Sequence, residues 1–500
     1  MKKLIFLIGF TLLYIAGISQ QLNLDNQPLI WLKADIGVDT SQWADQSGNG
    51  IHAQWKQSLN IIQQDFNYHP AIEITALNGP LEVPIILKKK ASIKVYTVYQ
   101  IWDTAYENGI WNIAFDTNTR VGLTSHRMVN TKKSIEYSGT TLPLPFINAL
   151  SQSWRNEKID TSLAKLYVGG TDSLSFNGKL AEVLYFDKRP SKTDNEKVHT
   201  YLAIKYRITL DIINYITSGD TIIWSTKNEK EYNHDVAGIV RDDQLQLNQK
   251  QSAGNGGNSE LIIHVGSLSE MNDSNQFNLP NNNYLIWGHN NKDLDKIEMD
   301  TATQLPNNNL IDRKWKINVK GNQIRNINTS LIIDGSKIDT SNINIELIIC
   351  NNADTVFLFD SSSVYFPDSV DAQKRYYFNN IKWDMDNSGS DLFTFRIAPS
   401  VLRTSKHPKE DLLSENQSSK PFDISIYPNP STGLFIIEVE PGEYVHYRME
   451  ISDVNGRILE QEEMTIEQLT KIDKTLKTTG VYFIKFSNKD ERKTVKVIVQ

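Results

Sequence analysis

The sequence predicts a mostly β protein built from several domains. Apolar residues alternate with polar ones in short runs, as at Tyr447, Met449 and Ile451, and this period of two predicts strands with one buried face. The run from Ser92 to Trp102 is dense in Ile, Val and Tyr, which predicts a long strand buried on both faces. With 500 residues, the chain has room for about three domains.

The composition fits an exported protein that does not bind nucleic acid. Hydrophobic residues make up 39% of the chain, which is enough for several cores. The 52 Lys and Arg residues against 59 Asp and Glu residues give a net charge of −7, whereas a nucleic-acid partner would favour a basic patch. The single cysteine, Cys350, lies in an apolar run and is expected to be a buried small hydrophobe.

The N-terminal residues predict a signal peptide over 1–19. Lys2 and Lys3 supply the positive start, residues 4–18 are apolar, and Gly17 and Ser19 suit cleavage before the next residue. A retained membrane anchor is the alternative. The apolar run is shorter than the roughly 20 residues that a membrane span needs, and this favours the signal peptide.

A first domain is predicted over 20–210. It opens with the tryptophan-led run 29–35, continues with the turn 45–50 (Asp-Gln-Ser-Gly-Asn-Gly) and ends its β-part with the strand 176–185. In the turn, glycine and asparagine allow left-handed backbone, and Asp45 can accept backbone N–H bonds. Together these runs resemble the laminin-G-like, concanavalin-type jelly roll, which implies a β-sandwich.

One helix is predicted over 191–206. Ser191 suits the N-cap, Asp194 lies favourably in the first turn, and Val198, Tyr201, Leu202 and Lys205 fall on one face. The run Tyr-Leu-Ala-Ile-Lys-Tyr over 201–206 resembles the helix that closes this kind of domain in many exported bacterial proteins. Arg207 stands where glycine is usual, so we expect the end of the helix to differ.

A second β-rich domain is predicted over 211–400, followed by a polar linker over 401–420. The runs 236–243, 247–252, 284–290 and 313–317 resemble a domain of unknown function that often follows the jelly roll in exported proteins. The resemblance implies β-structure and supplies no activity. Val240 replaces a usual glycine, which puts the geometry of a turn there in question.

A small β-sandwich is predicted over 421–500. Its run 427–433 (Tyr-Pro-Asn-Pro-Ser-Thr-Gly), the strand 434–439, and the runs 451–458, 479–484 and 493–500 resemble, in this order, the type A C-terminal sorting domain of the type IX secretion system. The resemblance implies export to the periplasm and then to the outside of the cell. The implied partners are the secretion machinery and its sorting peptidase, and the membrane is involved only through attachment to surface lipopolysaccharide.

The rest of the chain carries few signs of chemistry. We find no phosphate-binding glycine loop, no H-E-x-x-H zinc helix and no G-x-S-x-G elbow, so we assign no catalytic residue and no cofactor beyond the calcium considered below. We expect a secreted or cell-surface binding or adhesion protein that recognises glycans or proteins. Two alternatives stay open: a secreted polysaccharide hydrolase, whose carboxylate pair is defined only in the fold, and a structural surface component.

One segment has the spacing of half a calcium loop. Asp384, Asp386, Ser388 and Asp391 place oxygen atoms at alternating positions around a glycine, but the twelfth position is Phe395 and not glutamate. A polar turn leading into a strand is the alternative, and we favour it.

The tryptophans allow a similar choice. Trp31, Trp43, Trp55 and Trp102 could form a platform on which sugars stack, or they could pack in the core, which is the commoner role.

Overall fold

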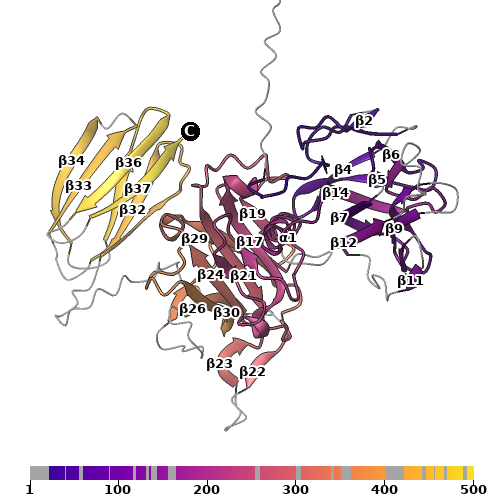
Figure 1. Cartoon of the computed structure of the whole chain (residues 1–500). Coiled ribbons are helices and arrows are strands. Elements are labelled where there is room, and N and C mark those ends of the chain that lie inside the picture. The colour runs from indigo at the N-terminus through magenta and orange to yellow at the C-terminus, as the bar shows by residue number, and fades with distance from the viewer. Residues whose placement is uncertain are drawn as a thin grey trace, which may run out of the picture. The chain divides into compact units, whose positions relative to one another are not determined.

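Antiparallel strands make up most of the regular structure, and the chain divides into two units, Met1–Pro408 and Lys409–Gln500 (Figure 1). The computed structural model describes residues 22–39, 41–55, 60–88, 90–115, 120–130, 134–136, 144–155, 165–253, 260–299, 306–338, 343–350, 362–399, 422–441, 446–454, 457–466, 470–487 and 492–500. The predicted signal peptide and linker lie outside these residues. Among the helices described, none is long and apolar enough to cross a membrane. The prediction of a mostly β protein is confirmed.

The first domain is a sandwich of two antiparallel sheets. The inner sheet has the order β12 (Phe146–Arg155), β7 (Lys90–Ile101), β14 (Gly178–Phe186), β5 (His69–Ile74) and β4 (Asn60–Phe66), with β1 (Ile30–Lys33) also on β14. The outer sheet has the order β11 (Ser134–Glu136), β10 (Arg127–Val129), β9 (Arg120–Thr124), β8 (Gly109–Ala114), β13 (Lys165–Val168), β6 (Leu81–Pro84), β3 (Ala53–Gln54) and β2 (Gln42–Trp43).

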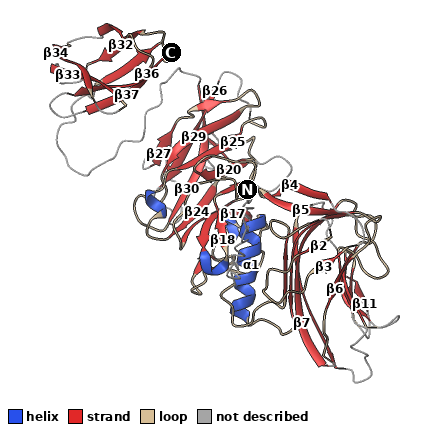
Figure 2. Cartoon of the chain, turned by 90° about the horizontal axis from the view of Figure 1, so that it is seen from above, coloured by secondary structure: helices blue, strands red, loops and turns tan. Residues whose placement is uncertain are grey.

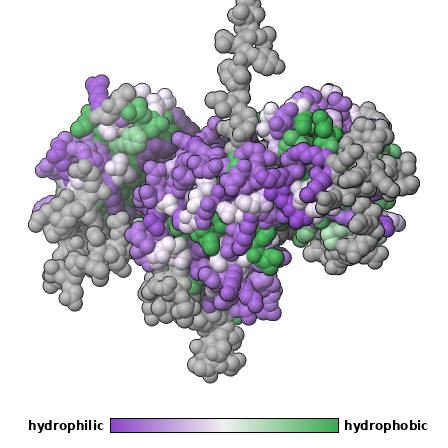
Figure 3. Space-filling model, in the orientation of Figure 1, coloured by the Kyte–Doolittle hydropathy of each residue, from purple (hydrophilic) through white to green (hydrophobic). Residues whose placement is uncertain are grey.

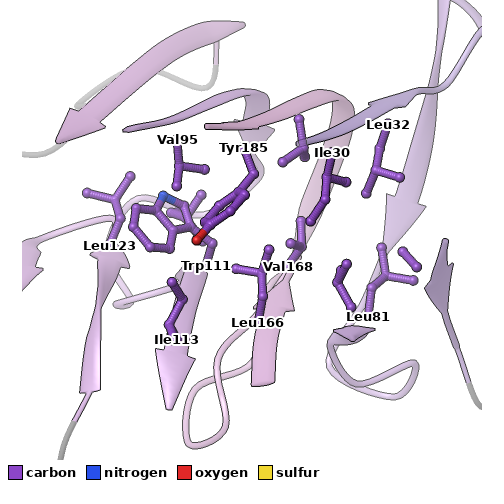
Figure 4. Close-up of a cluster of buried hydrophobic side chains, with 14 of the residues drawn as sticks. Ile30, Leu32, Leu81, Val95, Trp111, Ile113, Leu123, Leu166, Val168 and Tyr185 are labelled. Carbon is purple, nitrogen blue, oxygen red and sulfur yellow. The ribbon is translucent and has the colours of Figure 1, made fainter. Parts of the chain in front are cut away.

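The two sheets bury one core between them (Figure 4). Alternation along each strand decides which side chains enter it: on β8, Trp111 and Ile113 point inward, while Asn112 faces away from the core. The predicted run 92–102 forms most of β7, and its residues enter cores on both sides of the inner sheet. A β-sandwich therefore forms, while its assignment to the laminin-G-like jelly rolls stays a prediction.

The predicted helix is α1 (Lys192–Tyr206). The Ser191 hydroxyl accepts the backbone N–H of Asp194 at 3.0 Å, which confirms the predicted cap. Arg207 ends the helix in the left-handed conformation, with φ at 52°, and donates its backbone N–H to Ala203. The expectation that the helix would end differently without glycine is therefore wrong, because Arg207 adopts the backbone that glycine favours.

Helix α1 is buried on more than the one face that the sequence predicted. Every residue from Lys197 to Tyr206 is buried. The inner sheet covers one side of the helix, and β17 (His234–Asp242) covers another, where Ile204 approaches Gly238 (Figure 2). A helix that is buried nearly all round joins the layers on its two sides into one core.

The middle domain packs two further sheets around its own core. The larger sheet has the order β18 (Leu247–Gln249), β17, β21 (Asn283–His289), β24 (Trp315–Lys320), β30 (Ser390–Pro399), β23 (Pro306–Ile311) and β22 (Ile297–Met299), with β26 (Ile343–Cys350) between β30 and β27 (Ser362–Tyr365). The smaller has the order β19 (Gln251–Ala253), β20 (Leu261–Val265), β25 (Thr329–Asp334), β29 (Arg375–Ile381) and β28 (Ser369–Val370).

Short elements complete the middle domain: the hairpin β15 (Tyr215–Ile216) and β16 (Ile222–Trp224), and the 3-10 turns η2 (Lys230–Tyr232), η3 (Asp243–Leu245) and η4 (Ile324–Asn326). Val240 lies inside β17, paired with Tyr284 and Gln249, so no turn forms at this position. Cys350 is buried, as predicted.

The C-terminal domain is a small sandwich with its own core. One sheet has the order β31 (Asp423–Tyr427), β32 (Leu434–Glu440) and β35 (Thr470–Thr475), and the other has the order β34 (Ile458–Thr465), β33 (His446–Asp453), β36 (Gly480–Ser487) and β37 (Arg492–Val499). Tyr447, Met449 and Ile451 are all buried, which confirms the predicted alternation.

Candidate functional site

The four tryptophans considered as a sugar platform separate in the structure. Trp31 and Trp43 are buried in different cores, and Trp55 packs against the core of the sandwich. Only Trp102 is exposed, with 42% of its surface accessible. A platform of four tryptophans therefore does not form, because Trp31 on the inner sheet and Trp43 on the outer sheet both point into cores.

Trp102 begins a loop, 102–108, that joins β7 to β8 and carries a second exposed aromatic residue, Tyr106, with 73% of its surface accessible. The buried amide of Asn108 holds this loop in place. Its Nδ2 donates to the carbonyls of Asp103 and Tyr106 at 3.2 and 3.0 Å, and its Oδ1 accepts the Asn177 N–H at 2.9 Å. Since the Asn108 side chain uses both of its polar atoms, the two aromatic residues project from a fixed backbone.

A cleft of about 190 Å³ lies beside this loop, against β8, β9 and β10 of the outer sheet. Its lining mixes polar and apolar side chains and comprises Asn112, Arg120, Leu123, Thr124, Arg127, Val129, Thr171, Ser173 and Leu174. The loop and the cleft are joined by Glu107, whose carboxylate accepts bonds from the Arg127 guanidinium and from the Thr124 hydroxyl at 2.6 Å. Glu107 thus ties the loop to the edge of the cleft.

Both carboxylates nearest the cleft are already paired. The hydrogen bonds from Arg127 lower the pKa of Glu107. Asp172 lies 3.1 Å from the Arg120 guanidinium and accepts the Asn112 amide at 2.7 Å. A general acid in glycosidic cleavage needs a raised pKa, whereas the pKa of Glu107 is lowered.

The outer sheet is the side of the sandwich that is left open for such a site. The inner sheet presents its second face to α1, where Trp31, Tyr96 and Leu184 pack into the core shared with the helix. On β9, Val121 points into the sandwich, whereas Arg120 and Thr124 line the cleft.

Residues from several of the sequence runs meet in a buried charge cluster, Asp35, Glu182, Tyr201, Lys205 and Tyr206. Glu182 on β14 accepts the Tyr206 hydroxyl at 2.6 Å, the Lys205 ammonium at 2.9 Å and the Tyr201 hydroxyl at 3.1 Å. Lys205 also lies 2.9 Å from Asp35. Burial by itself would lower the pKa of Lys205, but Asp35 and Glu182 outweigh burial and raise it.

The surroundings of this cluster tie the first domain to the middle domain. His69 Nε2 on β5 lies 2.8 Å from Gln249 Oε1 on β18, and Asn67 Oδ1 accepts the Ser252 hydroxyl at 3.1 Å. The cluster therefore holds α1 against the first domain, while His69 and Asn67 reach the middle domain. The sequence runs contained these residues, but spacing along the chain does not reveal that they meet.

The predicted calcium segment forms a turn that leads into β30. Asp384 is buried and paired with Arg325, and its Oδ1 accepts the Gly389 N–H at 2.6 Å. Asp391 is buried as well and accepts the Asp384 N–H at 2.6 Å, while Asp386 is exposed and Ser388 bonds the Ser390 carbonyl at 2.9 Å. Within the described ranges, no group of three or more His, Cys, Asp or Glu side chains is placed to hold a metal ion. Calcium binding at Asp384, Asp386, Ser388 and Asp391 stays a prediction.

Comparisons with known proteins identify two parts of the chain. Residues 194–388 match the family described as "Domain of unknown function (DUF8202)", and residues 425–500 match the "Secretion system C-terminal sorting domain". The first match begins inside α1, so this family includes most of the helix that the sequence assigned to the first domain. No curated protein matches the chain.

Solved structures add little to these matches. The dimeric latent PorU from Porphyromonas gingivalis is 10% identical over 84% of this chain and 31% of its own, with a TM-score of 0.17, so this chain spans about a third of that protein. The BSP domain of a biofilm associated protein is 8% identical over 93% of this chain and 68% of its own, with a TM-score of 0.15. Tp47, the 47-kilodalton lipoprotein of Treponema pallidum, is 8% identical over 84% and 92%, with a TM-score of 0.11.

At these TM-scores the three structures carry no argument about fold or function. The family matches do, because they cover the runs on which the sequence resemblances rest. The chain thus carries a DUF8202 domain of unknown function at residues 194–388 and a C-terminal sorting domain at residues 425–500, and it is a secreted protein of the type IX system.

Proposed function

We propose that this protein binds glycans outside the cell through loop 102–108 and the adjoining cleft of the outer sheet. The observation that carries the proposal is the pair of exposed aromatic residues, Trp102 and Tyr106, on a loop fixed by Asn108. Aromatic residues with a large apolar face are normally buried, so two of them exposed on a rigid loop favour a binding role.

The chemistry of the surface suits a sugar. Aromatic faces pack against the apolar C–H faces of a pyranose ring, and the guanidinium group of Arg120, which lines the cleft, can bond its hydroxyls. Arg120 and Arg127 are each paired with a carboxylate, which orients the guanidinium groups without leaving a large net charge. A neutral or weakly acidic glycan is therefore the ligand class that we favour.

A binding role is favoured over the hydrolase and structural alternatives. Hydrolysis needs a carboxylic acid with a raised pKa and a second carboxylate about 5 to 10 Å away. The candidates at the cleft, Glu107 and Asp172, are paired with arginines. A purely structural component would have no need of exposed aromatics beside a polar cleft. A protein ligand remains the alternative within the binding class.

A glycan array combined with a hydrolysis assay on each bound glycan tests the proposal. We expect Trp102→Ala and Tyr106→Ala each to weaken glycan binding by roughly tenfold or more, the loss typical of a central aromatic contact. The matched control is Ile86→Ala. Ile86 is 93% exposed and follows the end of β6 that is remote from loop 169–174, so binding should not change.

Three results would contradict the proposal. Binding of no glycan at all would leave a protein ligand or a structural role. Equal binding by wild type and both aromatic variants would place the ligand elsewhere on the chain. Cleavage of a bound glycan would favour the hydrolase.

We also propose the finer steps of export that the sorting domain implies. After export to the periplasm by the signal peptide 1–19, the secretion machinery reads the sorting domain, and a sorting peptidase removes it. The remaining chain is then released or joined to surface lipopolysaccharide. Deleting residues 422–500 should hold the protein in the periplasm, and normal amounts of the truncated protein outside the cell would contradict this.

A further inference from the structure

The sorting domain exposes apolar side chains on the outer face of its four-stranded sheet. In β33 and β36, the residues that point into the core are Met449, Ile451, Ile484 and Phe486. Their neighbours along each strand point away from the core, because successive side chains alternate. This outer face is therefore expected to be polar, and most of it is: Arg448, Glu450 and Lys485 form a paired network at one end.

The other end of the same face is apolar. Ser452 on β33 pairs with Ile458 on β34 and with Phe483 on β36, so these three side chains stand in one row across the sheet. In the next row, Val481 pairs with Ile498. We call Ile458, Val481, Phe483 and Ile498, with Val454 in the adjoining turn, the outer-face patch.

The patch is exposed to an extent that packing within the domain does not explain. Val454, Ile458 and Phe483 are 62%, 51% and 37% accessible. Residues from three strands and a turn contribute, so the exposure is not that of a single misplaced side chain. Figure 3 shows that apolar areas interrupt a largely hydrophilic surface on this domain. Clustered exposure of this kind marks surfaces that another molecule covers.

A basic side chain borders the patch, because Lys496 pairs across the sheet with Phe483. Lys496 is exposed and has no ion-pair partner among the residues that the structure describes. By contrast, on the outer face of the other sheet Lys471 is paired with Glu438 at 3.0 Å, and Tyr427 bonds the same glutamate at 2.6 Å.

We infer that the outer-face patch is the surface through which the export machinery binds the sorting domain. The partner is a protein receptor with an apolar contact area bordered by carboxylates, which would pair with Lys496. The occupant is chosen on two grounds. The family match makes this domain the part that the machinery recognises, and Lys496, which lies beside the patch, has no ion-pair partner among the described residues, whereas Lys471 on the opposite sheet is paired with Glu438. Self-association of the chain is the competing occupant.

Export of the full chain in a type IX-secreting host tests this inference. We expect the double variant Ile458→Ser and Phe483→Ser to lower the ratio of exported to periplasmic protein by about tenfold or more, since both residues would be central contacts. Lys496→Glu should also lower export. The matched control is Leu434→Ser, which is 59% exposed on the other sheet.

Folding is measured on the purified full chain, so that a misfolded variant cannot imitate lost recognition. Because the substituted side chains are exposed, the Tm of each variant should stay within about 2 °C of wild type. Should a serine variant lose stability, Lys496→Glu still decides the question.

Wild-type export of both the double variant and Lys496→Glu would overturn the inference. So would a loss of export as large in the control as in the patch variants. A change of oligomeric state with normal export would show that the patch joins copies of the chain instead.

Discussion

Asp391 is expected to make the stability of the middle domain fall as the pH rises through neutrality. It lies at the start of β30 and is fully buried, with one carboxylate oxygen bonded to the Asp384 N–H at 2.6 Å. The other oxygen, Oδ1, has no hydrogen-bond partner among the described residues. Burial raises the pKa of Asp391 to about 7, and the carboxylates of Asp384 and Asp386 add to this.

The size and sign follow from proton linkage. In the unfolded chain the pKa of an aspartate is near 3.8, so between that value and about 7 the folded state holds one proton that the unfolded state has lost. The free energy of unfolding therefore falls as the pH rises through this window, by about 4 kcal/mol in total. The stabilising effect is fully present below about pH 4 and is lost above about pH 7.

The variant Asp391→Asn tests this reasoning, because an amide keeps an oxygen for the Asp384 N–H and does not titrate. Urea unfolding of the full chain, followed by tryptophan fluorescence, should show a free energy of unfolding that declines from pH 5 to pH 8 in the wild type. Trp383, buried next to Asp384, reports on this region. In Asp391→Asn the decline should be smaller by about 3 kcal/mol, the part of the calculated fall that lies between pH 5 and pH 7, and the variant should be the more stable protein at pH 8.

The control is Asp386→Asn, at an exposed carboxylate in the same turn, which should keep most of the wild-type pH dependence. Identical pH profiles for wild type and Asp391→Asn would refute the reasoning, since they would mean that Asp391 is ionised in the fold at all of these pH values.

Three further measurements probe other parts of the structure. Lys205→Met should lower the free energy of unfolding at pH 7 by about 3 to 5 kcal/mol, because it leaves Glu182 and Asp35 without their cation. Lys165→Met, in a surface pair with Glu82, should change it by less than about 1 kcal/mol. Equal effects would mean that the buried cluster contributes no more to stability than a surface ion pair. Millimolar calcium should leave the Tm unchanged relative to chelator, since Arg325 already neutralises Asp384, and a rise that Asp386→Ala abolishes would instead establish the calcium site. Ser191→Ala should lower stability by about 1 kcal/mol through loss of the helix cap, measured by thermal unfolding, and an unchanged Tm would show that tertiary packing alone holds the start of α1.

Local features of this fold were predictable from neighbouring residues. The alternation at Tyr447, Met449 and Ile451 depends only on the pleat of a strand, and the Ser191 cap depends on residues three positions apart. The Asp45 turn is equally local, and Asp45 does accept the Ser47 N–H at 2.9 Å. Such patterns need no knowledge of which strands pair.

The predicted helix face was too narrow for a reason that lies outside the helix. A second layer, β17, covers the side on which Ile204 lies, and periodicity within 191–206 carries no information about a partner from 234–242. No tryptophan platform forms for a similar reason. The exposure of each tryptophan depends on whether its face of the sheet is covered.

By itself, then, the sequence determined the β class, the helix with its cap, and the sorting domain with the export it implies, because these rest on local patterns or on an ordered run of motifs. Only the tertiary structure decided that Trp102 is exposed while Trp31 is buried, that Arg325 reaches Asp384 across 59 positions, and that Glu182, Lys205 and Asp35 share one buried cluster. Each of these depends on residues that are distant along the chain and are brought together only by strand pairing and core burial, and no periodicity of the sequence encodes that meeting.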